Sequence, residues 1–378
     1  MIRATMAVLL LAITGSALSA AERFQTKELL IAVDSFAGGL DHPWGMAFLP
    51  DGGMLVTERP GRIRFVSAEG QVSEPIAGVP EVVAMGQGGL LDVTLHPRFA
   101  DNRLVYFSFS EPGEDGANGT AIAHGRLADD LSALDDVEVI FRQQPKARSN
   151  AHFGSRLVFD RDGNLFATLG ERSAPRYRVL AQDLGTHLGK VIRIRDDGSV
   201  PDDNPFVDRP GAMPEIWSYG HRNPQGMARH PVTGAIWTHE HGPRGGDEVA
   251  IPKAGENHGW PIFSFGTEYS GAPITELKEH PPEFASPVWQ WSPSIAPSGM
   301  AFYDGDAIPE WKGDLFVGAL AGASLRRLLL EGDRVTGEEV LLAELGRRIR
   351  DVEVGPDGRL YLLTDEDDGE ILRIVAAD

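Results

Sequence analysis

Six polar side chains that could bind or transform a ligand each stand just before an apolar, alternating segment of the sequence. A histidine is a candidate general base near neutral pH. Arginines recognise carboxylates through paired hydrogen bonds, so three of them together would favour a ligand with several carboxylates. For any one arginine, a structural ion pair with an aspartate such as Asp92 or Asp351 is an equally good interpretation. The six residues are Gln87, His152, Arg222, Asn223, Arg348 and Arg350.

Glu171 is a candidate partner for the histidine. It follows the second apolar run after His152, and a carboxylate there could orient the imidazole and raise its basicity. A solvated loop carboxylate is an equally good interpretation of Glu171. The sequence leaves both open.

An acidic, glycine-rich segment from Glu240 to Glu248 is a candidate calcium site. Its Gly-Pro turn exposes backbone carbonyls, and Asp247 and Glu248 add carboxylates. Calcium accepts six to eight oxygen ligands of these two kinds. Such a loop is also often only a loop. The acidic runs 202–204 and 365–368 are most simply interpreted as solvated turns.

A repeated strand unit must position these residues. Each copy has an alternating apolar run, a turn that often carries Asp-Gly or Thr-Gly, and a second alternating run. Six copies begin near residues 45, 91, 157, 227, 300 and 352. They predict an all-β fold, a six-bladed β-propeller with four-stranded antiparallel blades and long inter-blade loops on the active face. Residues 27–35 are expected to close the ring against the last blade.

Equivalent positions of the blades of a propeller converge on its central axis. We therefore expect the six polar residues to line one pocket. The wide spacing of the middle copies predicts insertions there, and such loops on a rigid ring are where chemistry is usually found.

Composition excludes several classes of protein. The 378 residues carry 35 Lys+Arg against 55 Asp+Glu, a formal net charge of −20, which argues against a nucleic-acid binder because phosphate backbones need basic surfaces. The absence of Cys excludes thiol catalysis and disulfides. Residues 1–20 have a positive start, a short apolar run and small residues at the end, which is typical of a secretory signal peptide. This predicts an exported, periplasmic or secreted protein, with residues 21–378 as a single propeller domain and no stable membrane insertion.

An ordered series of motifs resembles the soluble sugar dehydrogenases that depend on pyrroloquinoline quinone (PQQ), and within them the aldose branch of the glucose/sorbosone dehydrogenase family. The resemblance covers about residues 40–374. The motifs are Gly86-Gln-Gly-Gly-Leu-Leu91, His152-Phe-Gly-Ser-Arg-Leu157, Gly220-His-Arg-Asn-Pro-Gln225, Glu240-His-Gly-Pro243 with Gly246-Asp-Glu248, Asn257-His-Gly-Trp-Pro261 and Arg348-Ile-Arg-Asp351.

The resemblance implies a cofactor and a division of roles. PQQ is planar and bears three carboxylates. His152 would take the proton of the sugar C1 hydroxyl, with Glu171 beside it and Arg222 near the quinone oxygen. The carbonyls of Gly242 and Pro243 would hold one Ca²⁺, and a second Ca²⁺ would lie near Glu248 and residue 258. The cofactor-binding residues it implies are Gln87, Arg222, Asn223, Tyr269, Ala321, Arg348, Ile349 and Arg350.

Two positions depart from family patterns. The glucose-type members have a PQQ-binding lysine where this chain has Ala321. The aldose branch also lacks this lysine, so other contacts must hold the cofactor's carboxylates. The family tyrosine of Asn-Tyr-Gly-Trp-Pro is replaced by His258, which puts the second calcium ion in doubt, although a backbone carbonyl there could still serve as a ligand.

The function that follows is the PQQ- and Ca²⁺-dependent oxidation of the C1 hydroxyl of aldoses to lactones, by His-assisted hydride transfer, with electrons passed to a quinone or another carrier. The alternative is a propeller without redox activity, either a calcium-dependent lactone hydrolase or a ligand-binding module. The joint presence of His152, Arg348 and Arg350 favours the dehydrogenase.

Overall fold

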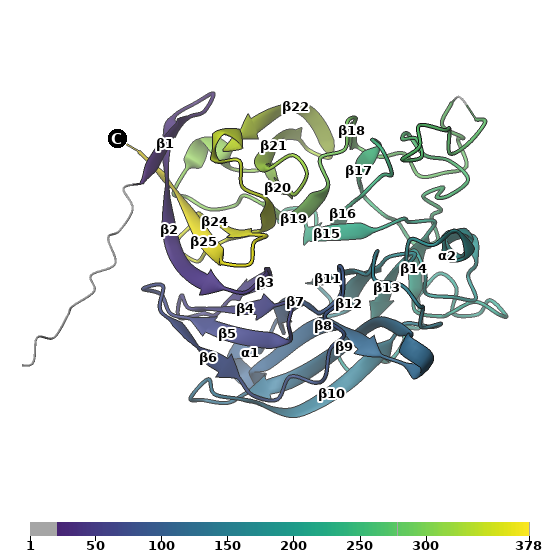
Figure 1. The fold of residues 1–378 in the computed structure, drawn as a ribbon, viewed down its shortest axis with the longest axis horizontal. Coiled ribbons are helices and arrows are strands. Elements are labelled where there is room, and N and C mark those ends of the chain that lie inside the picture. The colour runs from purple at the N-terminus through teal and green to yellow at the C-terminus, as the bar shows by residue number, and fades with distance from the viewer. Residues whose placement is uncertain (1–20, 278, 378) are drawn as a thin grey trace, which may run out of the picture.

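The computed structural model describes residues 21–277 and 279–377, so the expected signal peptide lies outside the described residues. Six antiparallel sheets form a ring, and each sheet is one blade of a β-propeller (Figure 1). Five blades have four strands. Numbered along the chain, they are blade 1 with β3 (Pro43–Phe48), β4 (Met54–Glu58), β5 (Arg62–Val66) and β6 (Val72–Ile76); blade 2 with β7 (Leu90–Leu95), β8 (Leu104–Pro112), β9 (Asn118–Leu127) and β10 (Leu134–Arg142); blade 3 with β11 (Gly154–Phe159), β12 (Leu165–Leu169), β13 (Lys190–Ile194) and β14 (Ile216–Tyr219); blade 4 with β15 (Pro224–Arg229), β16 (Ile236–Glu240), β17 (Asp247–Ala250) and β18 (Trp289–Trp291); and blade 5 with β19 (Pro297–Phe302), β20 (Leu315–Ala319), β21 (Ser324–Glu331) and β22 (Arg334–Leu341).

The sixth blade joins the two ends of the chain. It contains β23 (Ile349–Val354), β24 (Leu360–Thr364) and β25 (Gly369–Ala376), to which β2 (Leu30–Leu40) and then β1 (Glu22–Gln25) are added. In Figure 1 the purple β2 lies beside the yellow β25. The two strands pair from Ile31 opposite Ala376 to Leu40 opposite Gly369. The predicted ring closure by residues 27–35 is therefore confirmed, with a longer strand than expected.

The innermost strand of each blade is the first strand of a predicted repeat, and glycine allows the turn that follows. Gly52 and Gly358 have φ of +92° and +74°, a region that a residue without Cβ enters at little cost. At the start of each innermost strand the register with its neighbour shifts: between Pro43 and Met46, Leu90 and Val93, Gly154 and Leu157, Pro224 and Gly226, Pro297 and Met300, and Ile349 and Asp351. Such bulges re-aim side chains, and all six lie at the end of the axis where the candidate residues stand.

The core consists of apolar layers between neighbouring blades. Trp237 of blade 4 meets Phe302 of blade 5 edge to face, with ring centroids 5.4 Å apart. Near the axis an ion-pair network adds to this packing. The guanidinium of Arg156 on β11 lies 2.9 Å from a carboxylate oxygen of Asp92 on β7 and 2.9 Å from one of Asp351 on β23. Because these carboxylates also accept the backbone N–H of Leu157 and of Met46, they link blade 2 to blade 3 and blade 6 to blade 1.

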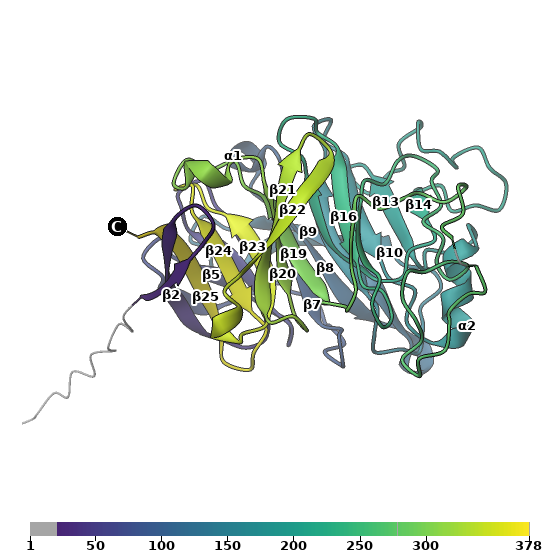
Figure 2. The same ribbon diagram turned by 90° about the horizontal axis from the view of Figure 1, so that it is seen from above.

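Helices are few and short. They are α1 (Phe99–Asn102), α2 (Pro175–Arg178) and 3₁₀ turns at Glu114–Gly116, Val179–Gln182, Pro309–Trp311 and Ala343–Leu345. None of the helices among the described residues is long and apolar enough to cross a membrane. The longest connections, 170–189, 195–215 and 251–288, lie within blades 3 and 4 rather than between blades. They gather with α2 on the teal-green side of the ring (Figure 2).

Candidate active site

His152 and Glu171 form a buried pair in blade 3. Nδ1 of His152 lies 2.9 Å from Oε1 of Glu171, whose side chain is fully buried. Oε2 of Glu171 accepts the backbone N–H of Ser173 at 2.6 Å, which fixes the carboxylate. Burial lowers the pKa of His152, although the hydrogen bond to Glu171 acts to raise it. A neutral imidazole that donates its Nδ1–H to Glu171 has Nε2 free as a proton acceptor.

The loop before β11 holds His152 in a conformation that is unusual for a residue with a side chain. Its φ is +52°, a strained region that folds keep where the surroundings enforce it. The N–H of His152 donates to Oε1 of Gln87 at 2.8 Å, and the N–H of Gly154 donates to Oδ1 of Asn223 at 3.2 Å. A Cβ on Gly170 would lie 2.2 Å from the carbonyl oxygen of His152, so only glycine fits behind it.

Arg172 holds the same loop through hydrogen bonds to its backbone. Its guanidinium donates to the carbonyls of Ala151, Ser149 and Asn118 and to Oδ1 of Asn118, and it lies 3.7 Å from the ring centroid of Phe153. Burial lowers the pKa of Arg172 to about 9. Cation–π contact and four acceptors compensate for that burial. Arg172 thus fixes the backbone that carries His152.

Arg222 joins this pair to a second group of candidate residues. Its carbonyl accepts the N–H of Glu171 at 2.9 Å. Its guanidinium donates to the carbonyl of Gly242 at 2.8 Å and lies 3.3 Å from the hydroxyl of Tyr269. Gly242, Pro243, Tyr269 and Ala321 all line one cavity of about 510 Å³. This is within the usual size of small-molecule sites.

Arg348 and Arg350 share one carboxylate. Asp365 accepts Nη2 of Arg348 at 2.6 Å and Nη2 of Arg350 at 3.0 Å. Burial alone would raise the pKa of Asp365, but the two guanidinium groups lower it to about 2. The interpretation of Asp365 as a solvated turn residue is wrong. Asp92 and Asp351, named above as possible partners of these arginines, bind Arg156 instead.

Ile349 lies between these arginines but its side chain belongs to the core. It is 1% exposed and packs among apolar side chains of blades 5 and 6. Its carbonyl accepts the hydroxyl of Ser298 at 2.6 Å. Any contact of Ile349 with a ligand must therefore come from its backbone.

The site keeps an excess of positive charge and of unused donors. Asp365 pairs with both Arg348 and Arg350, and Arg222 forms no ion pair with another described residue. Among the described residues, the buried donors Nε of Arg222, Nε of Arg59 and Nδ2 of Asn223 have no hydrogen-bond partner. Because buried donors are nearly always satisfied, these three fit a ligand rich in acceptors, such as one with several carboxylates.

The turn at Gly242 is built for exposed carbonyls. A Cβ on Gly242 would lie 2.2 Å from the carbonyl oxygen of Gly245, so a glycine is needed. Asp247 accepts the N–H of Gly242, Ile295 and Ala296, each at 2.8 Å, and also the hydroxyl of Ser294 at 2.6 Å. These hydrogen bonds give Asp247 the role of holding the turn, and a further role of Asp247 as a calcium ligand stays a prediction.

Glu248 and His258 lie beside His221 and Glu240, next to that turn. The rings of His221 and His258 stack with centroids 4.2 Å apart. Glu248 stands opposite Glu240 across the β16–β17 ladder. Gly242, Glu248 and His258 line one cavity of about 10 Å³, whereas Pro243 lies with Gly242 at the larger cavity.

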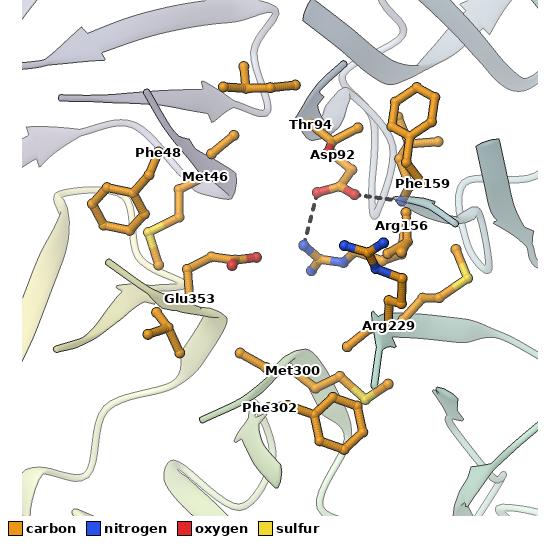
Figure 3. A pocket seen from close by; sticks show the side chains of 18 of the residues that line it. Met46, Phe48, Asp92, Thr94, Arg156, Phe159, Arg229, Met300, Phe302 and Glu353 are labelled. Atoms are coloured by element: carbon orange, nitrogen blue, oxygen red, sulfur yellow. Dashed lines mark hydrogen bonds and ion pairs between the residues drawn. The ribbon is translucent and has the colours of Figure 1, made fainter. Parts of the chain in front are cut away.

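The opposite end of the axis has a different pocket, of about 470 Å³. Figure 3 shows its apolar wall, with Met46, Met300 and Phe302 around the Asp92–Arg156 pair, and Glu353 pointing into the space. It contains none of the candidate residues. The Arg156 network separates it from the site at the other end, because Asp92 and Asp351 are bound there by the same guanidinium.

The family model described as Glucose / Sorbosone dehydrogenase matches residues 40–373. The chain belongs to this family. It is 51% identical over 346 residues to the aldose sugar dehydrogenase YliI of Escherichia coli K12, covering 91% of this chain and 92% of that one.

Solved structures of the family have the same fold. A crystal structure of a glucose dehydrogenase is 54% identical with a TM-score of 0.88, covering 92% of this chain and 99% of that chain. The PQQ-bound aldose sugar dehydrogenase of Streptomyces coelicolor is 30% identical with a TM-score of 0.76, covering 92% and 98%. The predicted family and the predicted six-bladed propeller are thereby confirmed.

Sequence reasoning missed several members of the site. A shared signal was present, because an acid ends the second strand of a blade or follows it within two residues at Glu58, Glu171, Glu240 and Asp365. Comparing second strands as well as first strands would have placed Asp365 beside the axis in this family fold. Arg172 had no such signal, since its contacts depend on the path of the loop 149–152.

Proposed function

We propose that this member of the glucose/sorbosone dehydrogenase family oxidises the C1 hydroxyl of aldose sugars to lactones with PQQ and Ca²⁺. The observation that carries the proposal is the His152–Glu171 pair, whose free Nε2 is a proton acceptor beside unpartnered donors and an excess of arginine. Neither a binding module nor a structural propeller needs these two features together.

The residues present fit the cofactor. Arg222, Arg348, Arg350 and Asn223 would hold its carboxylates and carbonyls, because they provide cationic and unpartnered donors. Tyr269, 71% exposed over the cavity, would cover one face of it. Ala321 is small and uncharged, so the wall of the cavity offers no charged group at this position. The arginines therefore provide the electrostatic part of cofactor binding. When bound, PQQ supplies a quinone that accepts the two electrons of the sugar.

The Gly242 turn fits a calcium ion. Its geometry requires glycine, Asp247 fixes it, and the carbonyls of Gly242 and Pro243 are hard oxygen donors of the kind that Ca²⁺ prefers. A cation there would act as a Lewis acid on an adjacent carbonyl. The carbonyl of Gly242 also accepts Arg222, so the turn and the arginine are held together.

His152 is the proposed base. Its Nε2 receives the proton of the C1 hydroxyl, while Glu171 holds Nδ1–H and stabilises the imidazolium that forms. Gln87 and Arg172 keep the loop in place, so the base does not have to be reoriented in each turnover. Arg222 stabilises negative charge that develops on the oxidant.

We also propose export and an external electron acceptor. The charged start, short apolar run and small residues of 1–20 support a periplasmic or secreted location. A quinone or small redox carrier would then reoxidise the enzyme.

The proposal is tested by product analysis. Purified protein is loaded with PQQ and Ca²⁺, supplied with an aldose and a dye acceptor, and assayed for lactone by mass spectrometry before hydrolysis. Lactone formed in proportion to reduced dye supports it. Hydrolysis of added lactone without dye reduction would instead establish the hydrolase.

A further inference from the structure

A second cluster of ligand-type side chains lies on the outer side of Arg222. One nitrogen each of His221 and His258 and one oxygen of Glu240 all lie within 4.8 Å of one another. A cavity of about 10 Å³ touches Glu240, Glu248 and His258. Such a volume holds a single water-sized particle, which is also the scale of one bare metal ion.

His258 has a ligand atom with nothing to bind. Its Nε2 is buried and, among the described residues, has no hydrogen-bond partner. The ring cannot turn freely because it stacks on His221 at a centroid distance of 4.2 Å. Buried imidazole nitrogens are normally satisfied, so this atom indicates a missing partner.

His221 has the arrangement expected of a metal ligand. Its Nε2 lies 2.8 Å from the hydroxyl of Ser218, and its Nδ1 lies 3.0 Å from Oε1 of Glu240. Metal-binding histidines usually engage a polar group with the nitrogen that does not bind the metal. Ser218 would fix the ring in this way, leaving Nδ1 for an ion shared with Glu240.

Among the described residues, the carboxylates of the cluster are not paired with a lysine or arginine side chain, although Arg222 lines the same cavity. Glu240 and Glu248 face each other on neighbouring strands, and within residues 21–277 and 279–377 neither forms an ion pair with a lysine or an arginine. Two partly buried carboxylates side by side favour a proton or a cation between them. A divalent cation bound there would balance both charges.

We propose that His221, Glu240, Glu248 and His258 bind a divalent transition metal of the zinc class. Two imidazole nitrogens and two carboxylate oxygens are a set typical of four-coordinate Zn²⁺ or Co²⁺. Calcium prefers six to eight oxygens, so this set disagrees with the structural Ca²⁺ that the family resemblance implies near Glu248. The three ligand atoms of His221, Glu240 and His258 lie within 4.8 Å of one another, and Glu248, the fourth proposed ligand, lines the same small cavity as Glu240 and His258.

The site would position Arg222 rather than take part in the oxidation. Oε2 of Glu240 accepts the N–H of Arg222 at 2.5 Å. Trp260, two residues after His258, lies with its ring centroid 5.3 Å from the Arg222 guanidinium. A metal bound by both Glu240 and His258 would therefore fix the two groups that contact Arg222, the carboxylate of Glu240 and the ring of Trp260.

The test uses untagged mature protein without PQQ, after chelation of all metals. Co²⁺ is titrated and followed by its visible absorption, which is strong for four-coordinate sites. We expect one equivalent to bind with that spectrum, Zn²⁺ to bleach it, and an equal concentration of Ca²⁺ to leave it unchanged. Thermal unfolding with and without Zn²⁺ provides a second readout, since an ion that binds the folded state raises the melting temperature.

Two variants complete the test. His258→Tyr and His258→Gln should each weaken Co²⁺ binding by at least about tenfold. His124→Gln is the matched control, because His124 also has a buried nitrogen without a partner but stands on β9, away from the cluster. Co²⁺ that gives no four-coordinate spectrum, is displaced by Ca²⁺, or binds equally well to both His258 variants would overturn the proposal. None of these outcomes depends on PQQ or on sugar oxidation.

Discussion

The carboxylate of Glu171 lies 2.9 Å from Nδ1 of His152, and the two side chains meet at the open end of one antiparallel hairpin in blade 3. His152 precedes β11 and Glu171 follows β12, so the pair is set by the bulged pairing of these strands. Because the carboxylate is fully buried and also accepts the N–H of Ser173, the imidazole has one orientation and one tautomer.

Replacing Glu171 should impair turnover without impairing cofactor binding. In Glu171→Gln the imidazole loses a charged partner, and we expect kcat to fall on the order of 10–100-fold, as for other orienting groups. Steady-state dye reduction measures this. Glu114→Gln, an exposed acid in a surface turn, is the control. An unchanged kcat in Glu171→Gln would show that the carboxylate does not act on the base.

The pH profile should report the same pair. Burial lowers the pKa of His152, and Glu171 opposes that effect. The base must be neutral, so kcat/KM should be constant at neutral pH and fall only below the ordinary histidine range, as the ring takes up a proton. Glu171→Gln removes a contribution that raises the pKa, so its acid limb should move to lower pH. An acid limb that moves to higher pH in the variant would contradict this assignment.

The arginines of blade 6 should control cofactor affinity. Arg350→Met removes a charge-assisted hydrogen bond worth about 1.5–3 kcal/mol, which corresponds to roughly 10–100-fold weaker PQQ binding. Fluorescence or absorbance titration of the apoprotein measures it. Arg373→Met is the matched control, because Arg373 also pairs with an aspartate, Asp34, but on the outer strands. Equal affinities of the two variants would remove Arg350 from the cofactor site.

The Gly242 turn should be needed for calcium. In Gly242→Ala the new Cβ would lie 2.2 Å from the carbonyl oxygen of Gly245, so the turn must shift and calcium-dependent activation should be lost. Gly337→Ala is the control, because a Cβ there would lie 3.5 Å from Leu329. Activation is followed by adding Ca²⁺ to metal-free, PQQ-loaded protein. Activation that is the same in both variants would place calcium elsewhere.

The axial network should contribute strongly to stability. Arg156→Met leaves Asp92 and Asp351 buried without their cation, and breaking such a pair costs about 3–5 kcal/mol in the free energy of unfolding. Arg126→Met breaks an exposed pair with Asp135 and should cost about 1 kcal/mol or less. Chemical denaturation compares them. Equal losses would mean that the network is not a structural link between blades.

The propeller ring and about half of the candidate site could be predicted from the sequence, because the repeated strand unit locates the blades and the polar residues that precede them. The alternation and the turn glycines locate the innermost strands, and residues just before those strands converge on the axis, as His152 and Asn223 do. Long-range pairing was not predictable. Asp365 follows strand β24, and Asp351 lies within strand β23. The bulged pairing of these strands determines which arginine each aspartate contacts. The position of Glu248 opposite Glu240 likewise depends on the β16–β17 ladder.

The most direct test of the central claim separates binding from turnover at His152. Apoprotein and His152→Ala are each titrated with PQQ in the presence of Ca²⁺, and then mixed with an aldose and a dye acceptor. We predict stoichiometric, Ca²⁺-dependent binding to both, with the rate of dye reduction by the variant on the order of 10²–10⁴-fold lower. Turnover by His152→Ala at the wild-type rate, or no binding of PQQ to the wild-type chain at micromolar concentrations, would contradict the account.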